Sequence, residues 1–262
     1  MMEIYMIRHG ETMWNQQHRL QGRKDIPLND VGLAGARIAA EALKDVHFNR
    51  VFSSPLVRAK KTAEIILKNH PDLSIEPLDD LQEIAFGTGE MRDDVPHTEA
   101  EKEILDHLKR WFAYPDTVAP LPGGESIREV KDRIEHFFDT YLYPNEDTYE
   151  RVMVTCHGGI LRGVESIVRN LSDADYWDGG IVPNCGAMVL ELKDGKLSIE
   201  KVVDLLVPDK PQQKPVEPEA VRLEERFIQH PALAIEQSRL AIDSMAEEAK
   251  RNFVEAVALL HG

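Results

Sequence analysis

Two kinds of apolar pattern alternate along the first 170 positions of the chain. Short apolar runs at residues 4–7, 50–53 and 152–156 are typical of buried strands. Residues 33–43 and 57–68 place apolar or small side chains at helical spacing, and helices are also expected over 126–141 and 158–169. This alternation predicts an α/β fold with a mostly parallel central sheet and helices on both faces.

Residues 80–125 interrupt the alternation. They contain an acidic loop, an expected helix at 99–112 and a proline-rich turn at 115–122. Segments of this kind, placed over the end of a sheet, often shape a substrate pocket. Further on, two alternating runs at 187–193 and 196–203 flank Asp194-Gly195, a dipeptide favoured in tight turns, and therefore predict a hairpin.

The pattern changes again near residue 207. Four prolines between 208 and 218 predict a stiff linker, so we expect a main domain over 1–206 and a Pro-rich linker with a helical extension over 207–262. The extension carries an apolar stripe at steps of three and four residues: Ile242, Met245, Ala249, Phe253, Ala256 and Leu260. The stripe either packs against the chain's own domain, which we favour, or pairs with a second copy in a homodimer.

Composition and charge narrow the range of partners. The chain has 262 residues and a net charge of -15, which argues against nucleic acid and anionic membranes because both require a basic face. No apolar run reaches the roughly 18 residues of a membrane span, and no signal segment opens the chain, so we expect a cytoplasmic protein. Two cysteines cannot form a disulfide framework, and we interpret Cys156 as a buried packing residue.

The ends of two expected strands carry the candidate chemistry. The first strand runs into Arg8, His9 and Gly10, and the strand at 152–156 runs into His157. Ligands of open α/β sheets bind at the carboxyl ends of the strands, so both histidines are expected at one site. A protein this acidic that binds an anion must gather its positive groups locally, which predicts a cationic pocket in a negative surface.

The motifs around these residues resemble those of the histidine phosphatase superfamily, which contains cofactor-dependent phosphoglycerate mutases and many small-molecule phosphatases. The resemblance covers about the first 200 residues and implies a phosphoglycerate mutase-like fold. It rests on these segments: Arg8-His9-Gly10-Glu11-Thr12, Trp14-Asn15, Arg19-Leu20-Gln21-Gly22, Ser53-Ser54-Pro55-Leu56-Val57-Arg58-Ala59, Leu81-Gln82-Glu83, Pro122-Gly123-Gly124-Glu125-Ser126 and Thr155-Cys156-His157-Gly158-Gly159.

Hydrolysis of a phosphate monoester dianion sets three tasks, and the resemblance implies residues for each. Arg8 and Arg58 would neutralise phosphate oxygens through their planar, permanently charged guanidinium groups, and His157, if protonated, would add a third cationic donor. His9 is the expected nucleophile: one neutral ring nitrogen attacks phosphorus and forms a phosphohistidine, while a backbone carbonyl holds the proton on the other nitrogen. Glu83 is the expected general acid for the leaving oxygen.

The resemblance also implies weaker contacts to phosphate or substrate. These are expected from Asn15, Gln21, Gly22 and the amide of Gly158, and Asn184 is expected to support the same loop. No metal or other cofactor is expected, because the remaining histidines are scattered without metal-ligand spacing and no phosphate-binding P-loop is present.

Three functions remain open, and we favour a metal-independent phosphatase that hydrolyses a small-molecule phosphate monoester. A phosphoglycerate mutase is the first alternative, but mutases of this family usually carry a longer and more basic insertion than residues 83–122, which are short and mostly acidic. The second alternative is a module that binds a phosphorylated ligand without turnover. Efficient isomerisation of 3-phosphoglycerate would favour the mutase, and binding without any reaction would favour the module.

Overall fold

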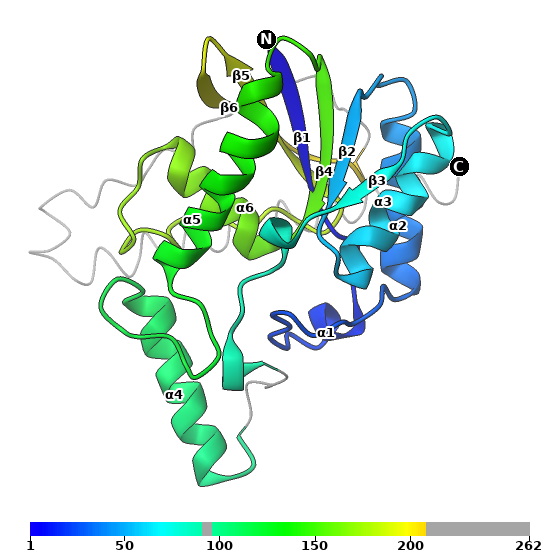
Figure 1. Cartoon of the computed structure of the whole chain (residues 1–262). Helices are drawn as coiled ribbons and strands as arrows, with labels where there is room; N and C mark the ends of the chain where they lie inside the picture. The colour runs from blue at the N-terminus through cyan, green and yellow to red at the C-terminus, as the bar shows by residue number, and fades with distance from the viewer. Residues whose placement is uncertain (91–95, 208–262) are drawn as a thin grey trace, which may run out of the picture. The chain divides into compact units, whose positions relative to one another are not determined.

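The computed structural model describes residues 1–90 and 96–207 (Figure 1). Its centre is a six-stranded sheet in the order β3-β2-β4-β1-β5-β6. The strands are β1 (Met2–Arg8), β2 (Arg50–Ser53), β3 (Ile75–Pro77), β4 (Arg151–Cys156), β5 (Gly186–Lys193) and β6 (Lys196–Asp204). The first four of these run parallel, whereas β5 is antiparallel to β1 and to β6. The mostly parallel sheet predicted from the sequence is confirmed.

Helices cover both faces of the sheet, because each strand of the central group alternates its apolar side chains between two cores. The helices are α1 (Met13–Gln16), α2 (Asp30–Ala42), α3 (Val57–Ile66), α4 (Glu99–Ala113), α5 (Ile127–Phe137) and α6 (Gly158–Val168). On one face, Met6 and Val154 pack with side chains of α5 and α6. On the other face, Ile7 and Met153 pack with alanines of α2 and α3. Figure 1 shows these two helix pairs on opposite sides of the strands.

The register of the central strands places the two site histidines next to each other. Arg8 is the partner of Cys156 in the parallel β1–β4 ladder, and each of these residues is the last of its strand. His9 and His157 therefore leave the sheet at the same level, on neighbouring strands. The amide of His9 continues the ladder by donating to the Cys156 carbonyl at 3.0 Å.

The element bounds agree closely with the sequence pattern in most places. Asn29 caps α2, Ser126 forms a capping box with Glu129 at the start of α5, and the hairpin turns at Asp194-Gly195. The α-helix of α5 ends at Phe137, before the predicted 141, and continues as a π-helical turn over Phe138–Leu142. Strand β3 was not predicted because it has only three residues, ends in a proline and is only partly buried.

The extension predicted for residues 207–262 lies, beyond Val207, outside the described residues, so the linker, the apolar stripe and the homodimer stay predictions. In the described ranges, we find no helix with the length and apolar content needed to cross a bilayer.

Candidate active site

The two histidines at the strand ends form the centre of the candidate active site. The ring centroids of His9 and His157 are 5.2 Å apart, and both side chains are almost completely buried. Figure 1 shows β1 and β4 side by side, with the loop to α1 following the end of β1. The pairing of the strands therefore brings together two residues that are far apart in sequence.

His9 is held in the neutral form with a defined orientation. Its Nδ1 lies 2.7 Å from the Gly10 carbonyl oxygen, which can only accept, so Nδ1 carries the proton and Nε2 keeps a lone pair. Burial, together with the charges of Arg58 and Arg8, lowers the pKa of His9 well below its ordinary value. The expected backbone carbonyl partner is thus present.

Arg58 lies at the start of α3 and is fully buried. Its guanidinium donates to the Gly22 and Lys24 carbonyls at 2.7 Å each, and its Nε lies 3.3 Å from Nε2 of His9. Burial lowers the pKa of Arg58 to about 10, with Glu83 the largest opposing charge, so the side chain stays cationic at neutral pH. The loop that follows His9 thus directs this cation at the His9 ring.

Arg8 presents a second buried cation to the same place. Its Nη1 donates to the Val182 carbonyl at 2.8 Å, whereas its buried Nε has no hydrogen-bond partner in the described part of the chain. Burial lowers the pKa of Arg8, and the negative charge of Glu83 opposes that change. A buried guanidinium nitrogen without a partner is costly, so an anion bound here would satisfy it.

His157 shows the same combination of one satisfied and one open ring nitrogen. Its Nε2 lies 2.7 Å from the hydroxyl of Ser54, and its buried Nδ1 has no partner among the described residues. Burial and the nearby charge of Arg58 lower the pKa of His157 well below its ordinary value. The free protein therefore holds His157 neutral, so the protonated form considered from the sequence would require a bound anion to restore the charge.

Glu83 lies against the amino terminus of α6. Its Oε2 accepts from the Gly159 amide at 3.3 Å, and its Oε1 accepts from the Ile84 amide at 3.0 Å. A Cβ at Gly159 would lie 2.5 Å from Oε1 of Glu83, so only glycine permits this approach. The structure thus brings Glu83 to the same helix start that His157 precedes.

The four residues expected to make weaker contacts have structural partners here. The Asn15 side chain accepts from the Thr12 amide at 3.1 Å, and Oε1 of Gln21 lies 3.0 Å from the Thr12 hydroxyl. Gly22 has a positive φ of 53° and supplies the carbonyl that holds Arg58, and Gly158 lies against the Arg8 guanidinium. Their contacts with a substrate stay predictions.

Several residues that support the site were not singled out from the sequence. Thr62 accepts from the Gly10 amide at 3.0 Å and donates to the Arg58 carbonyl. Arg23 and Arg133 both bind Glu125 behind the segment that carries Glu83. Only Glu125 stood within a recognised motif, and nothing in the sequence pattern distinguishes Arg133 from the other charged residues of its helix.

Two further observations concern other chemistry. Burial raises the pKa of the Cys156 thiol far above its ordinary value, which agrees with its interpretation as a packing residue. Within the ranges that the structure describes, no group of three or more histidine, cysteine, aspartate or glutamate side chains is arranged to hold a metal ion.

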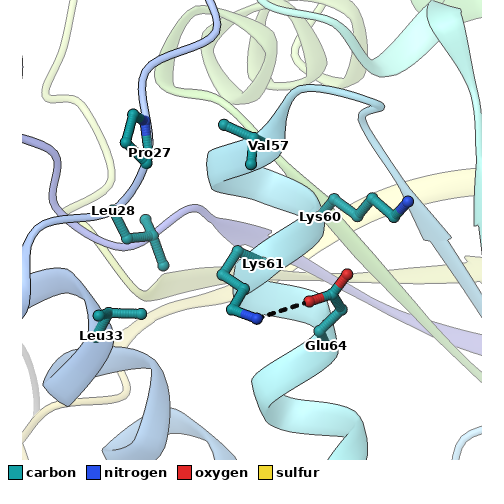
Figure 2. A pocket seen from close by; sticks show the side chains of 7 residues that line it. All are labelled: Pro27, Leu28, Leu33, Val57, Lys60, Lys61 and Glu64. Carbon is teal, nitrogen blue, oxygen red and sulfur yellow. Dashed lines mark hydrogen bonds and ion pairs between the residues drawn. The ribbon is translucent and has the colours of Figure 1, made fainter.

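A surface hollow between α2 and α3 contains none of the candidate site residues. Figure 2 shows its lining, and it has a volume of about 380 Å³. Its walls are mostly apolar, and Lys61 at the rim is paired with Glu64 at 3.0 Å. Its two lysines, Lys60 and Lys61, are surface residues of one helix, and we assign no function to this hollow.

Comparisons with known proteins agree with this geometry. Residues 4–205 match the sequence profile of the histidine phosphatase superfamily (branch 1). An uncharacterised phosphatase, PhoE of Bacillus subtilis, is 33% identical over 67% of this chain and 80% of its own length. A 2,3-bisphosphoglycerate-dependent phosphoglycerate mutase of Allorhizobium ampelinum is also 33% identical, over 64% of this chain and 80% of its own.

Solved structures show the same fold. The α-ribazole phosphatase of Shigella flexneri superposes with a TM-score of 0.68 at 23% identity, over 80% of this chain and all of its own. A phosphoserine phosphatase of Entamoeba histolytica, solved with 3-phosphoglyceric acid, has a TM-score of 0.65 at 26% identity, over 79% of this chain and all of its own. With the profile match over most of its length, the chain belongs to the histidine phosphatase superfamily (branch 1).

Proposed function

We propose that this protein is a metal-independent phosphatase that hydrolyses a small-molecule phosphate monoester through a phosphohistidine on His9. The observation that carries the proposal is the state of His9. Its ring is buried and neutral, its Nδ1 proton is held by the Gly10 carbonyl, and its Nε2 faces a buried arginine. A neutral imidazole with a fixed tautomer is what attack on phosphorus requires.

In the first step, the buried cations hold the phosphoryl oxygens while His9 attacks. Arg8 binds through its open Nε, and Arg58 turns its Nε from His9 to a phosphate oxygen. The bond from Nε2 of His9 to phosphorus forms as the ester P–O bond breaks. Glu83 transfers its proton to the leaving alcohol oxygen, which departs neutral.

In the second step, Glu83 accepts a proton from water as that water attacks phosphorus. The N–P bond breaks, inorganic phosphate is released and His9 returns to its neutral form. The open Nδ1 of His157 is placed to donate to a phosphoryl oxygen once the dianion has restored its proton. No step of this cycle requires a metal ion.

Phosphoglycerate mutase activity is the second candidate, because a relative with that name is 33% identical to this chain over 175 aligned residues. A mutase must hold a second anionic group on its substrate. α4 carries three exposed cations that could do so, and two of them are compensated: Lys102 is paired with Glu99 at 3.4 Å and Lys109 with Asp106 at 3.8 Å, whereas Arg110 is the third. This compensation favours hydrolysis.

The test is phosphate release in the presence of a chelator. The substrates are p-nitrophenyl phosphate and a panel of alkyl monoesters that includes phosphoserine and 3-phosphoglycerate. We expect release by the native chain, at least about a thousandfold less by His9→Ala, and unchanged release by His47→Ala, an exposed histidine between α2 and β2. Quenching in alkaline detergent, in which the N–P bond survives, should trap a phosphohistidine in the native chain and not in His9→Ala.

Three results would overturn the proposal. Loss of release in chelator, with recovery on adding a divalent metal, would contradict the metal-independent mechanism. Isomerisation of 3-phosphoglycerate faster than phosphate release, in the presence of 2,3-bisphosphoglycerate, would establish the mutase. A folded native chain that binds phosphate and releases none from any ester would establish the binding module.

A further inference from the structure

A partly buried charge cluster lies directly behind Glu83. It consists of Glu125, Arg23 and Arg133. Oε1 of Glu125 accepts from Nη2 of Arg23 at 2.7 Å and from Nε of Arg133 at 2.9 Å, and Oε2 accepts from Nη2 of Arg133 at 3.1 Å. The side chains of Glu125 and Arg133 are only 15% and 13% exposed, so these bonds are shielded from water.

This cluster binds the backbone of residues 80–85 at several points. Arg133 donates to the carbonyls of Asp80 at 2.6 Å, Gln82 at 2.7 Å and Glu83 at 3.3 Å. Arg23 donates to the Glu83 carbonyl at 3.2 Å. The second carboxylate oxygen of Glu125 accepts from the Ala85 amide at 2.9 Å.

The pattern of these contacts is more specific than a stabilising ion pair requires. The Glu83 carbonyl receives both arginines, and the segment is fixed on each side of Glu83. The Glu83 side chain therefore leaves a clamped backbone and reaches the Gly159 amide. A misplacement of a reacting group by about 1 Å can cost a hundredfold in rate, so such clamping has a catalytic consequence.

We propose that Glu125, acting through Arg23 and Arg133, is a positioning residue that holds Glu83 where it protonates the leaving oxygen. The inference rests on the proposed function, because it assigns Glu83 the role of general acid. Glu125 itself does not touch the substrate. Its removal lets the 80–85 segment shift and leaves Arg133 without its carboxylate.

Substrates with different leaving groups distinguish a positioning role of Glu125 from a purely structural one. The p-nitrophenolate ion departs without a proton, whereas an alkoxide requires protonation by a general acid. We expect Glu125→Gln to slow phosphohistidine formation, measured in a single turnover, at least about tenfold on the alkyl monoester of the panel that the native chain hydrolyses fastest. On p-nitrophenyl phosphate, the rate of this step should change less than about threefold. The measurement is confined to the first step because Glu83 also accepts the proton of water in the second step, which is common to both esters.

Glu129→Gln is the matched control. It removes one carboxylate four residues further along, on the exposed side of the start of α5, where glutamine can still complete the capping box with Ser126. Both of its rates should equal those of the native chain. In a Glu83→Gln background, adding Glu125→Gln should lower neither rate further, because the residue it positions no longer donates a proton.

The outcomes separate the inference from the proposed function. If Glu125→Gln lowers both rates in equal proportion, or neither, the inference is overturned while the phosphatase stands. If the native chain hydrolyses no alkyl ester, the role of Glu83 as general acid is contradicted, and the inference about Glu125 is overturned with it. Should Glu125→Gln fail to fold, Arg23→Gln serves instead: its side chain is 36% exposed and Arg133 remains in place, and the same selective loss is expected.

Discussion

At the scale of single residues, the site depends on burying charged and polar groups that have no complete set of partners. Arg8 and His157 each keep one open nitrogen, and both of these atoms are buried. Such groups are costly in a folded protein, and a bound anion would offset their cost. Burial also keeps His9 neutral, so one physical cause accounts for both the neutral histidine and the open nitrogens.

Gly159 lies against Glu83 so closely that it leaves no room for a side chain. Replacing it with alanine would place a Cβ 2.5 Å from Oε1 of Glu83 and 2.8 Å from Cδ1 of Ile84. We expect Gly159→Ala to displace the Glu83 carboxylate and to lower kcat on alkyl monoesters at least about tenfold. Its free energy of unfolding should change by less than about 1 kcal/mol, because alanine favours the helix and offsets part of the clash.

Kinetics and urea unfolding of Gly159→Ala measure these two effects. Gly180→Ala is the matched control, since a Cβ there meets no atom within 4 Å. An unchanged kcat in Gly159→Ala would contradict the placement of Glu83 against α6.

At the scale of elements, the loops after the strands are fixed by helix caps. Asn29 caps α2 by accepting from the Gly32 amide at 2.8 Å, and its side chain also donates to Glu11 at 2.7 Å. Its backbone amide donates to the Glu11 carbonyl at 3.0 Å. The start of α2 therefore secures the loop that follows His9.

Loss of this cap should lower the stability of the fold by a measurable amount. We expect Asn29→Ala to lower the free energy of unfolding by about 1 kcal/mol, because the Gly32 amide loses its acceptor. Asn29→Ser keeps a capping oxygen and should lose only a few tenths of a kcal/mol. Urea unfolding of the native chain and the two variants measures these free energies. An equal loss of stability in both variants would show that the contact with Glu11 matters more than the cap.

Most of these elements could be predicted because their signals are local. The cap at Asn29, the capping box at Ser126 and the two strand-end histidines are each visible in a few neighbouring residues. The role of Arg133 could not be predicted, since it depends on which loop α5 packs against. The roles of Thr62 and Asn184, which bind the backbone at Gly10 and His9, likewise follow from contacts distant in sequence, although Asn184 was flagged by resemblance.

At the scale of the whole molecule, the chain has a net charge of -15, whereas its candidate site brings cationic side chains together. The long-range field therefore does not attract a phosphate ester, and binding of the proposed substrate would depend on short-range contacts with Arg8 and Arg58. The cationic pocket expected from the sequence has this form: two buried arginines within reach of two buried histidines.

Burying two neutral histidines makes the stability of the whole fold depend on pH. The pKa values of His9 and His157 are lowered well below 6.5 in the folded chain, so below that pH the unfolded chain binds protons that the folded chain does not. The free energy of unfolding therefore decreases as the pH is lowered through this range. The two histidines together should cost about 2 kcal/mol between about pH 6.5 and 5.5.

Urea unfolding at pH 7.5, 6.5 and 5.5 measures this slope directly. The variant with both His9→Gln and His157→Gln should lose most of it, whatever its absolute stability, because glutamine does not titrate. If that variant keeps the slope of the native chain between about pH 6.5 and 5.5, other groups are responsible for it.

The position of β1 in the sheet also determines when the protein becomes an enzyme. Although β1 is synthesised first, both of its neighbours, β4 and β5, come from the second half of the described chain. Before β1 can pair, the chain must close a long loop without any stabilising contact, and such closure is slow. A ribosome-bound chain that stops before Arg151 carries His9 without the strand that places His157 beside it. The candidate site is therefore assembled late in biosynthesis, and any activity of the proposed phosphatase would report that the sheet has closed.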